Sequence, residues 1–509
     1  MPNHTLLFMD YETFNRNTKG GRVSQFACIR TNADLTIIPQ SAMSLFCTQT
    51  IDNLPSPEAA IVTNLTPQKI NRIKQGIERT QYSNLEVKEI VLNEYWFTSK
   101  INDIMTTPNT CVLGYNSLRF DDEFTRNLLY RNLFDPYLRE WKDGNSRFDV
   151  YLLVLATYVL KPKLINFPNA YDEITGEQIF HSVTCQPLPS FKLEDLSAAN
   201  GIHHSNAHDA FNDVEATIGI FKKIQSQNID FVKEIMAFRN KHLVKDFLNN
   251  HKKPFIHISQ FYGKEQYSFG VLYSLFENDR SALCLNLNYP VDQILKLSAE
   301  ELTEYFFNEN NRQNRKLAVV IHFNQCPILA KISDYPERLQ SFNVDRNILA
   351  KNLNLIKENV NVLRDKLKPL FLKDFDQQNT STDTDLMIYS GFFDDQEKKA
   401  MGDFHLQIRN AKYNVISSVS TNSRLIEMSF KIIARNFPEN LDGIQLRKWR
   451  EYAIQRLTNK TFGAELTIPE FIIELNQVKA KYPDQRAIIK DILDYANSIF
   501  EKLGLPAIQ

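Results

Sequence analysis

The chain has 509 residues, of which 43% are hydrophobic and 23% charged, and its formal net charge is −1 at pH 7. A chain of this length is too long for one hydrophobic core, so about three domains are expected. A net charge near zero excludes a global field that attracts nucleic acid. Any polyanionic partner must therefore be held by local basic patches.

Hydropathy and cysteine usage indicate the cellular compartment in which the protein is expected. No segment has the ~20 uncharged apolar residues of a membrane span, and the N-terminal "MPNHT" is not a basic region followed by an apolar stretch. The six cysteines include no CxxC pair, which argues against zinc ribbons and a disulfide framework. We therefore expect no secretory signal, and a reducing, cytoplasmic location.

Residues 1 to 225 alternate short apolar strands with helical patterns. Strands are predicted at "TLLFMDYE" (5–12), "RVSQFACIRTN" (22–32) and "NTCVLGYNS" (109–117), and helices at 121–134 and 207–225, where apolar residues recur at spacings of three and four. Between them, the segment "NAYDEITGEQIFHSVTCQPLPSF" (169–191) contains Gly176 and prolines typical of a hairpin or loop insertion. This order predicts an α/β fold.

The rest of the chain shows two further secondary-structure patterns. Short β-rich runs between about 250 and 330, such as "SFGVLYSLF" and "LAVVIHFNQCPILA", predict a small antiparallel barrel or sheet. After about residue 345 helical periodicity dominates, as in 346–372 and 484–503. The low-complexity segment "DQQNTSTDTD" (376–385) is predicted to be an exposed linker.

The first strand ends in two carboxylates, Asp10 and Glu12, with one residue between them. Side chains alternate across a strand, so both lie on one face. Two unpaired anions at that separation repel, and a hard divalent ion such as Mg²⁺ removes the repulsion. The other interpretation is a strand end at which both acids meet water.

Two further segments carry candidate partners for these acids. Asp121 and Asp122 begin a helix, where acids complement the helix dipole, and a salt bridge from Asp122 to Arg126 one turn later is expected. His208 precedes Asp213 near another helix start. A histidine there can cap the helix or bind zinc with its neighbours; beside a metal site it can also act as a general base.

In combination these residues resemble the DEDD exonucleases of the histidine subtype, with D-x-E, a central aspartate and H-x₄-D. Other motifs extend the resemblance nearly end to end to the bacterial exodeoxyribonuclease I family: "DYETF", "LGYNSLRFDDEFTRN", "YRNLFDPY", "LPSFKLEDLSAANGIHHSNAHDA", "HFNQCPILA", "YSGFFDD" and "ARNFPENLD". The stretch 170–186 departs from the family pattern because it is longer than usual.

The resemblance implies a multidomain α/β protein. Its parts are a ribonuclease H-like nuclease domain (1–225), an SH3-like β-rich domain (226–345) and a C-terminal helical domain (346–509). It implies stepwise 3′-to-5′ removal of nucleoside 5′-monophosphates from single-stranded DNA in repair and recombination, by a monomer that uses Mg²⁺. It also implies a partner, the single-stranded-DNA-binding protein with its acidic tail.

The implied mechanism uses two Mg²⁺ ions, for which Mn²⁺ can substitute, roughly 3.5–4 Å apart. Asp10 bridges both ions, and Glu12, Asp121 and Asp213 complete the ligand set. His208 accepts the proton of the attacking water. Asp121 is chosen over Asp122 because the family pattern falls on the first acid and Asp122 has its expected salt bridge.

Single-stranded DNA is held by stacking rings and local cations. The candidate contacts near the motifs are Tyr11, Phe14, Phe120, Arg126, Tyr137, Trp141, Arg147 and Lys192. For each apolar ring, core packing is an equal alternative, and Trp141 in the polar stretch "LREWKDGNSR" is the preferred stacking residue. For the partner's acidic tail, the candidates are Arg346, Lys351 and Lys357 on an amphipathic helix, which can also be an ordinary solvated face.

Two other functions remain open from the sequence. An RNA exonuclease can use the same active site, because only contacts to the 2′-OH separate the two substrates. A non-catalytic single-strand binder could keep the fold, although such a protein is expected to have lost at least one of the five catalytic residues.

Overall fold

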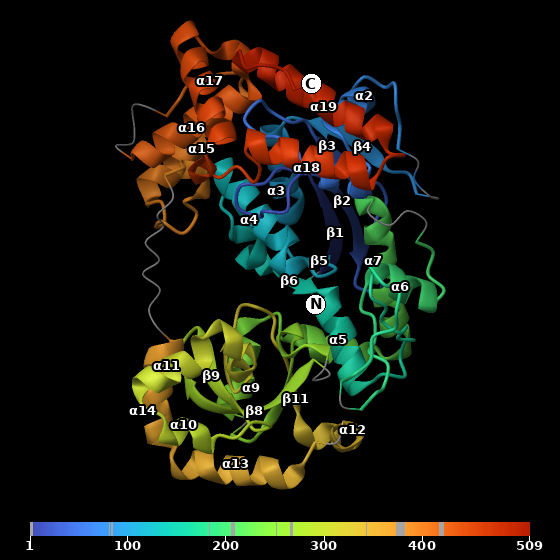
Figure 1. Cartoon of the computed structure of the whole chain (residues 1–509), viewed down its shortest axis with the longest axis vertical. Coiled ribbons are helices and arrows are strands. Elements are labelled where there is room, and N and C mark those ends of the chain that lie inside the picture. Colours follow the sequence, from blue (N-terminus) through green and yellow to red (C-terminus); the bar gives the residue numbers. More distant parts are fainter. Residues whose placement is uncertain are drawn as a thin grey trace. The chain divides into compact units, whose positions relative to one another are not determined.

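The computed structural model describes residues 4–80, 82, 85–182, 184–204, 209–250, 252–264, 268–342, 344–372, 382–416 and 422–508 (Figure 1). Contacts group the chain into two compact units. The first unit contains Met1–Arg147, Ser205–Glu215 and Gln377–Gln509, and the second contains Phe148–His204 and Ala216–Asp376. The division at residues 225 and 345 that was expected from the sequence stays a prediction.

The first unit is built on a six-stranded sheet in the order β4-β3-β2-β1-β5-β6. Its strands are β1 (Thr5–Thr13), β2 (Val23–Asn32), β3 (Met43–Cys47), β4 (Lys88–Leu92), β5 (Thr110–Gly114) and β6 (Ser146–Asp149). β1 is central because it pairs antiparallel with β2 and parallel with β5. This position explains why its sequence is apolar up to the first acid.

Four helices accompany this sheet: α1 (Pro57–Thr63), α2 (Pro67–Lys74), α3 (Glu94–Met105) and α4 (Asp121–Arg131). Side chains of α3 and α4 meet those of β1 and β2 in one buried cluster, which includes Met9, Phe26, Phe97 and Phe124. This core fixes both β1 and the start of α4.

The C-terminal helices belong to the same unit. They are α15 (Asp395–Arg409), α16 (Ser423–Asn436), α17 (Gly443–Thr458), α18 (Ile468–Lys481) and α19 (Arg486–Leu503). α19 packs against α2, α18 packs against α1, and α16 packs against α3 (Figure 1). A shared core of α17, α18 and α19 includes Leu54 and Ala60 from the N-terminal part.

The expectation of an exposed linker over 376–385 is wrong at its described end. Asp383 and Asp385 are buried, because Lys431 donates to Asp383 at 2.7 Å and Arg435 donates to Asp385 at 2.8 Å. These partners lie far along the chain, so the polar composition of the segment gave no sign of them.

The second unit contains a five-stranded antiparallel sheet in the order β10-β9-β8-β7-β11. Its strands are β7 (Phe255–Ile258), β8 (Phe269–Glu277), β9 (Ser281–Asn286), β10 (Ala318–His322) and β11 (Ile328–Lys331). Its helices are α5 (Val150–Leu160), α6 (Leu193–Ala199), α7 (Ala210–Gln227), α8 (Ile229–Ala237), α9 (Lys241–Asn250), α10 (Asp292–Lys296), α11 (Ala299–Phe307), α12 (Pro336–Ser341), α13 (Arg346–Glu358) and α14 (Val360–Phe371). The first turn of α7 is grouped with the first unit.

Short 3₁₀ helices complete the described elements, at Ser117–Arg119, Leu138–Glu140, Lys142–Gly144, Gln260–Tyr262, Glu309–Lys316, Ile332–Asp334, Thr384–Leu386, Pro438–Asn440 and Lys460–Phe462. Of the hairpin or loop insertion expected around 170–186, the structure has a hairpin, with antiparallel bridges from Tyr171 to Gln178 and from Phe180 to Pro187. The predicted succession of α/β, β-rich and helical parts is confirmed. Among the residues that the structure describes, no helix has the length and apolar character to cross a bilayer.

Candidate active site

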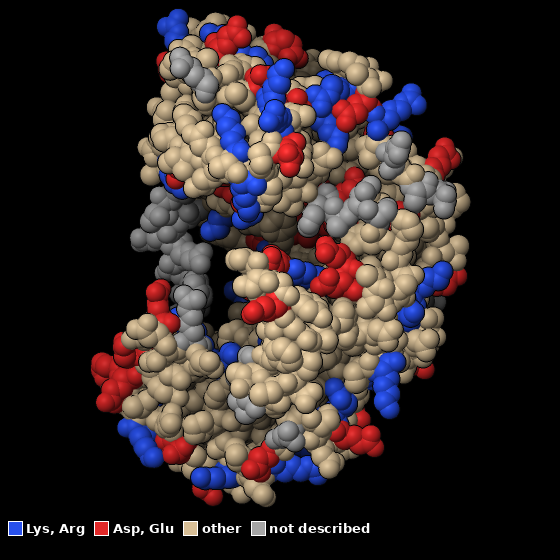
Figure 2. Space-filling view, turned by 45° about the vertical axis from the view of Figure 1, so that its right-hand side comes forward, with Lys and Arg blue, Asp and Glu red and all other residues tan. Residues whose placement is uncertain are grey.

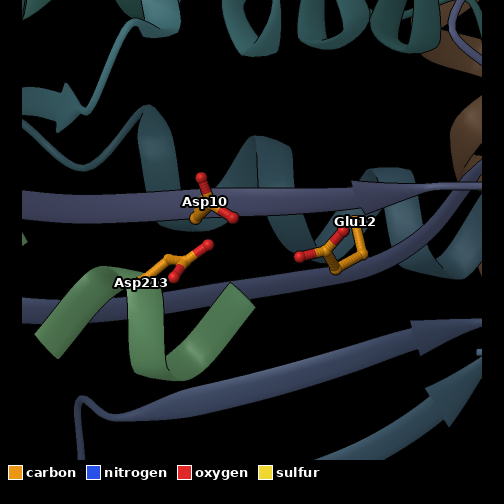
Figure 3. A group of neighbouring side chains, drawn as sticks. All are labelled: Asp10, Glu12 and Asp213. Carbon is orange, nitrogen blue, oxygen red and sulfur yellow. The ribbon is translucent and has the colours of Figure 1, made fainter. Parts of the chain in front are cut away.

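Three carboxylates converge at one point of the first unit. Asp10 and Glu12 come from the same face of β1, and Asp213 comes from the first turn of α7 (Figure 3). One ligand atom from each residue lies within 4.8 Å of the other two. The alternation of β1 explains why the first two acids share a face, as the sequence predicted.

The electrostatics of this group favour a bound cation. Burial is the largest effect that raises the pKa of Asp10 well above its usual value, and the charges of Asp121 and Asp213 raise it further. The pKa of Glu12 is raised well above its usual value by burial and then by Asp213. Carboxylates in this state favour protonation unless a cation neutralises them. Oxygen ligands of this type suit hard divalent ions.

Asp121 approaches this group from a separate element, because it is the first residue of α4. Its charge raises the pKa of both Asp10 and Glu12, so it faces the same site. The group within 4.8 Å, for the part of the chain described, does not include it. A cation shared by all four acids therefore depends on how α4 is held relative to β1.

Asp209 is a nearby acid that the sequence reasoning missed. It directly precedes α7, and its Oδ1 accepts hydrogen bonds from the backbone N–H groups of Phe211 at 3.1 Å and Asn212 at 3.2 Å. Its charge also raises the pKa of Asp10 and Glu12. An aspartate directly before an apolar helical pattern is the usual N-cap signal, which could have identified it. His208, the residue before it, lies outside the described residues.

The prediction that Asp122 pairs with Arg126 is wrong. Asp122 forms ion pairs with Arg139 at 2.7 Å and Arg147 at 2.8 Å, whereas Arg126 forms ion pairs with Glu140 and Glu123. Burial would raise the pKa of Asp122, but the charges of Arg139 and Arg147 outweigh burial and lower the pKa to about 2. Tertiary partners thus replace the local helical pair. Both carboxylate oxygens of Asp122 are held by arginines, which supports the choice of its neighbour Asp121 as the metal ligand.

Comparison with known proteins agrees with this geometry. Three family models match the chain: "Exonuclease" over 7–221, "Exonuclease I SH3-like domain" over 239–373 and "Exonuclease I C-terminal domain" over 382–499. The chain is 32% identical over 510 residues to exodeoxyribonuclease I of Escherichia coli (strain K12), covering 97% of this chain and 98% of the relative. The chain belongs to the exodeoxyribonuclease I family.

Two solved structures resemble the chain over nearly its whole length. One is described as "The zinc ion bound form of crystal structure of E.coli ExoI-ssDNA complex", with a TM-score of 0.82, 30% identity and coverage of 98% of this chain and 99% of that chain. The other is an "ExoI/SSB-Ct complex", with a TM-score of 0.80, 30% identity and coverage of 98% and 99%. The family, fold class and exodeoxyribonuclease activity predicted from the motifs are confirmed.

Two of the predicted DNA contacts are core residues in this family member. Tyr11 is 4% exposed and packs on Phe26, and Phe14 is 1% exposed among Phe46, Leu65 and Ile70. Neither ring offers an open face to a base. The alternative of core packing, which the sequence left open, therefore holds for both, and we omit them from the proposed contacts.

The other candidates near α4 differ in how accessible they are. Arg126 lies over the Tyr137 ring, 5.5 Å from its centroid, and both are partly buried. Arg147 is buried in ion pairs with Asp122 and Glu140, so its charge is already matched. Phe120 is half-buried against Phe124.

Trp141 and Lys192 are the most accessible of the predicted contacts. Trp141 is 65% exposed, as the polar surrounding sequence predicted. Lys192 is exposed and forms an ion pair with Glu173 of the 170–186 hairpin. On the face drawn in Figure 2, basic and acidic side chains are interspersed, which fits the net charge near zero.

The predicted partner-binding residues lie on α13. Arg346, Lys351 and Lys357 are all exposed, and Ile348 on the same helix is exposed as well. Asn352 and Ile356 of the same helix are buried. α13 therefore exposes three basic side chains and one apolar side chain, while part of its surface is packed.

Proposed function

We propose that this exodeoxyribonuclease removes nucleoside 5′-monophosphates one at a time from the 3′ end of single-stranded DNA, in DNA repair and recombination. The observation that carries the proposal is the group of Asp10, Glu12 and Asp213, with ligand atoms within 4.8 Å of one another. Family membership accounts for the exonuclease activity on DNA and for its dependence on a divalent metal. The direction, the product and the identity of the metal are our proposal.

The residues fit a site for two Mg²⁺ ions. Every candidate metal ligand is a carboxylate oxygen. The raised pKa values of Asp10 and Glu12 mean that keeping these acids ionised costs free energy, and bound cations would remove that cost. Asp10, Glu12, Asp121 and Asp213 would hold the ions. When bound, the ions supply positive charge for the scissile phosphate and for the leaving 3′ oxygen.

The remaining chemistry belongs to residues of the chain. His208 accepts the proton of the attacking water, and its place before Asp209 and Asp213 brings it to the same segment as the ligands. Trp141 stacks on an unpaired base, and Lys192 contacts a phosphate. These roles stay predictions, as do the monomeric state and the cytoplasmic location.

Digestion of labelled nucleic acids tests this function. Linear single-stranded DNA, circular single-stranded DNA, duplex DNA and single-stranded RNA are compared with Mg²⁺ and with a chelator. We expect only the linear single strand to shorten from its 3′ end, with 5′-mononucleotides released and no reaction with the chelator. Loss of circles would indicate an endonuclease, an equal rate on RNA an exoribonuclease, and binding without cleavage a scaffold.

For the partner, we propose that α13 binds the acidic C-terminal tail of the single-stranded-DNA-binding protein. The support is the exposed Arg346, Lys351 and Lys357 together with Ile348. A labelled tail peptide should bind Lys351→Glu at least several-fold more weakly than the wild type, because the exposed cation is reversed. Lys296→Glu on α10 is the matched control, since Lys296 is also exposed and lies in the same unit. Equal binding to both variants would contradict the assignment.

A further inference from the structure

Tyr11 lies between two of the proposed metal ligands but points away from them. Asp10 and Glu12 face the site from one side of β1, so the side chain of Tyr11 leaves from the other side. Its ring packs against Phe26 with centroids 5.0 Å apart and is 4% exposed. A buried tyrosine needs a partner for its hydroxyl.

The partner of Tyr11 is on the helix that carries the fourth acid. The Tyr11 hydroxyl lies 3.1 Å from Oγ1 of Thr125, and the same Oγ1 lies 2.7 Å from the backbone oxygen of Asp121. A hydroxyl carries one proton and a carbonyl none. Thr125 therefore donates to Asp121 and accepts from Tyr11, which joins β1 to the first turn of α4.

This connection matters because the four acids do not share one element. Asp10 and Glu12 are fixed by β1, whereas Asp121 moves with α4. Asp121 lies close enough to raise the pKa of Asp10, yet outside the group whose ligand atoms are within 4.8 Å. A small shift of α4 along β1 would thus change the reach of Asp121 to a shared ion.

Among the residues near this connection, Tyr11 is one whose hydroxyl can be removed without leaving unmatched buried charges. The neighbouring Asp122 is held by Arg139 and Arg147 in a buried network whose removal would leave unmatched charges. Thr125 is fully buried, and its bond to Asp121 is the ordinary one of a helical threonine. The Tyr11 hydroxyl adds a polar contact between this helix turn and the ligand strand to the apolar core that the two elements share.

We propose that Tyr11 is a positioning residue for metal binding: through Thr125, its hydroxyl sets the distance of Asp121 from Asp10 and Glu12. The inference rests on the proposed metal site. It assigns to Tyr11 a role in metal affinity and none in contact with DNA. It also explains why an aromatic hydroxyl, instead of a purely apolar side chain, lies between the two acids.

Direct measurement of Mn²⁺ binding to the full chain tests the inference, by calorimetry or by the paramagnetic signal of free Mn²⁺. Tyr11→Phe should raise the Kd for Mn²⁺ by about threefold to tenfold, the effect of one lost hydrogen bond. Thr125→Val should do the same, and Thr125→Ser, which keeps the hydroxyl, should restore the affinity. In activity assays, Tyr11→Phe should need more Mg²⁺ for half-maximal rate while kcat at saturating Mg²⁺ stays unchanged.

Tyr130→Phe is the matched control. Tyr130 is also on α4 and is also 4% exposed, and its hydroxyl donates to the backbone oxygen of Thr384 at 3.2 Å. It should lose a similar amount of stability with no change in Mn²⁺ affinity. Equal weakening in Tyr130→Phe and Tyr11→Phe, or no weakening in Tyr11→Phe, overturns the inference.

Asp10→Asn separates this inference from the proposed site. If Asp10→Asn loses Mn²⁺ binding while Tyr11→Phe keeps the wild-type Kd, the inference fails and the metal site stands. If Asp10→Asn binds Mn²⁺ as the wild type does, the metal site itself is wrong, and the inference falls with it.

Discussion

Arg435 of α16 and Asp52, which follows β3, form an ion pair in which neither side chain is exposed to solvent and Nη2 lies 2.9 Å from Oδ2. Asp52 also accepts from Arg22 at 2.8 Å, and Arg435 also donates to Asp385 at 2.8 Å. Burial would raise the pKa of Asp52, but the charges of Arg435, Arg22 and Arg456 hold it well below its usual value. Arg435, on the C-terminal helix α16, therefore supplies positive charge that the buried Asp52 in the N-terminal part of the chain requires.

Arg435→Met should strongly destabilise the first unit. It leaves Asp52 and Asp385 buried with fewer positive partners, a change that costs about 3–5 kcal/mol when one side of a buried pair is removed. Chemical denaturation at pH 7 measures the loss. Lys481→Met is the control, because the pair of Lys481 with Glu58 is exposed and should contribute nothing measurable. Equal effects of the two substitutions would contradict a structural role for the buried pair.

Asp10→Asn should raise the stability of the metal-free protein. The folded pKa of Asp10 is raised above its unfolded value, so the folded chain holds the proton to higher pH and stability falls as pH rises through that interval. The substitution removes this loss. The melting temperature of the metal-free variant should exceed that of the wild type at pH 8, and the difference should shrink toward pH 4.

The control for this effect is Asp230→Asn, because Asp230 is largely exposed. Its melting temperature should follow the wild type at each pH. Added Mg²⁺ should raise the melting temperature of the wild type more than that of Asp10→Asn, since binding to the folded state stabilises it. A metal-free Asp10→Asn protein less stable than the wild type at pH 8 would contradict the electrostatic account of the site.

Trp141→Ala should weaken single-stranded DNA binding by about 1–3 kcal/mol, the usual contribution of one stacked base. The ring is 65% exposed, so the fold should be unaffected. Fluorescence anisotropy with a labelled oligonucleotide measures the affinity. Tyr171→Ala, which removes a ring 56% exposed on the inserted hairpin, is the control and should bind as the wild type does. A reversed order of the two affinities would show that the stacking surface is elsewhere.

His208→Ala should reduce turnover by a factor of ~10²–10⁴, the usual contribution of a general base. Only neutral imidazole accepts the proton of water, so wild-type activity should rise with pH through the pKa of His208. His208→Asn should be about as slow as His208→Ala. An active Asn variant would instead make His208 a helix cap, because asparagine caps helices well.

The sequence predicted the parts of the site that local geometry controls. The D-x-E spacing places Asp10 and Glu12 on one face because strand side chains alternate. The helix start at Asp121 was visible from its acids and apolar spacing. The approach of Asp213 to these residues was accessible only through the family motif, since nothing local joins α7 to β1.

The errors share a physical cause. Arg139 and Arg147 replaced Arg126 as partners of Asp122, because Arg126 is itself paired with Glu140 and Glu123. The buried Asp383 likewise looked like linker, because its partner Lys431 lies on a distant helix. Long-range partners of charged residues leave no periodic signal in a sequence, whereas strand alternation and helical spacing do.

The measurement that tests the account most directly is the rate of nucleotide release from the 3′ end of linear single-stranded DNA by Asp213→Asn under saturating Mg²⁺. Asp213 is one of the three acids whose ligand atoms lie within 4.8 Å, and asparagine keeps its size without its charge. We predict no release above background, together with a wild-type circular dichroism spectrum and retained binding of single-stranded DNA. Release at the wild-type rate would contradict the assignment of this carboxylate group as the metal-dependent active site.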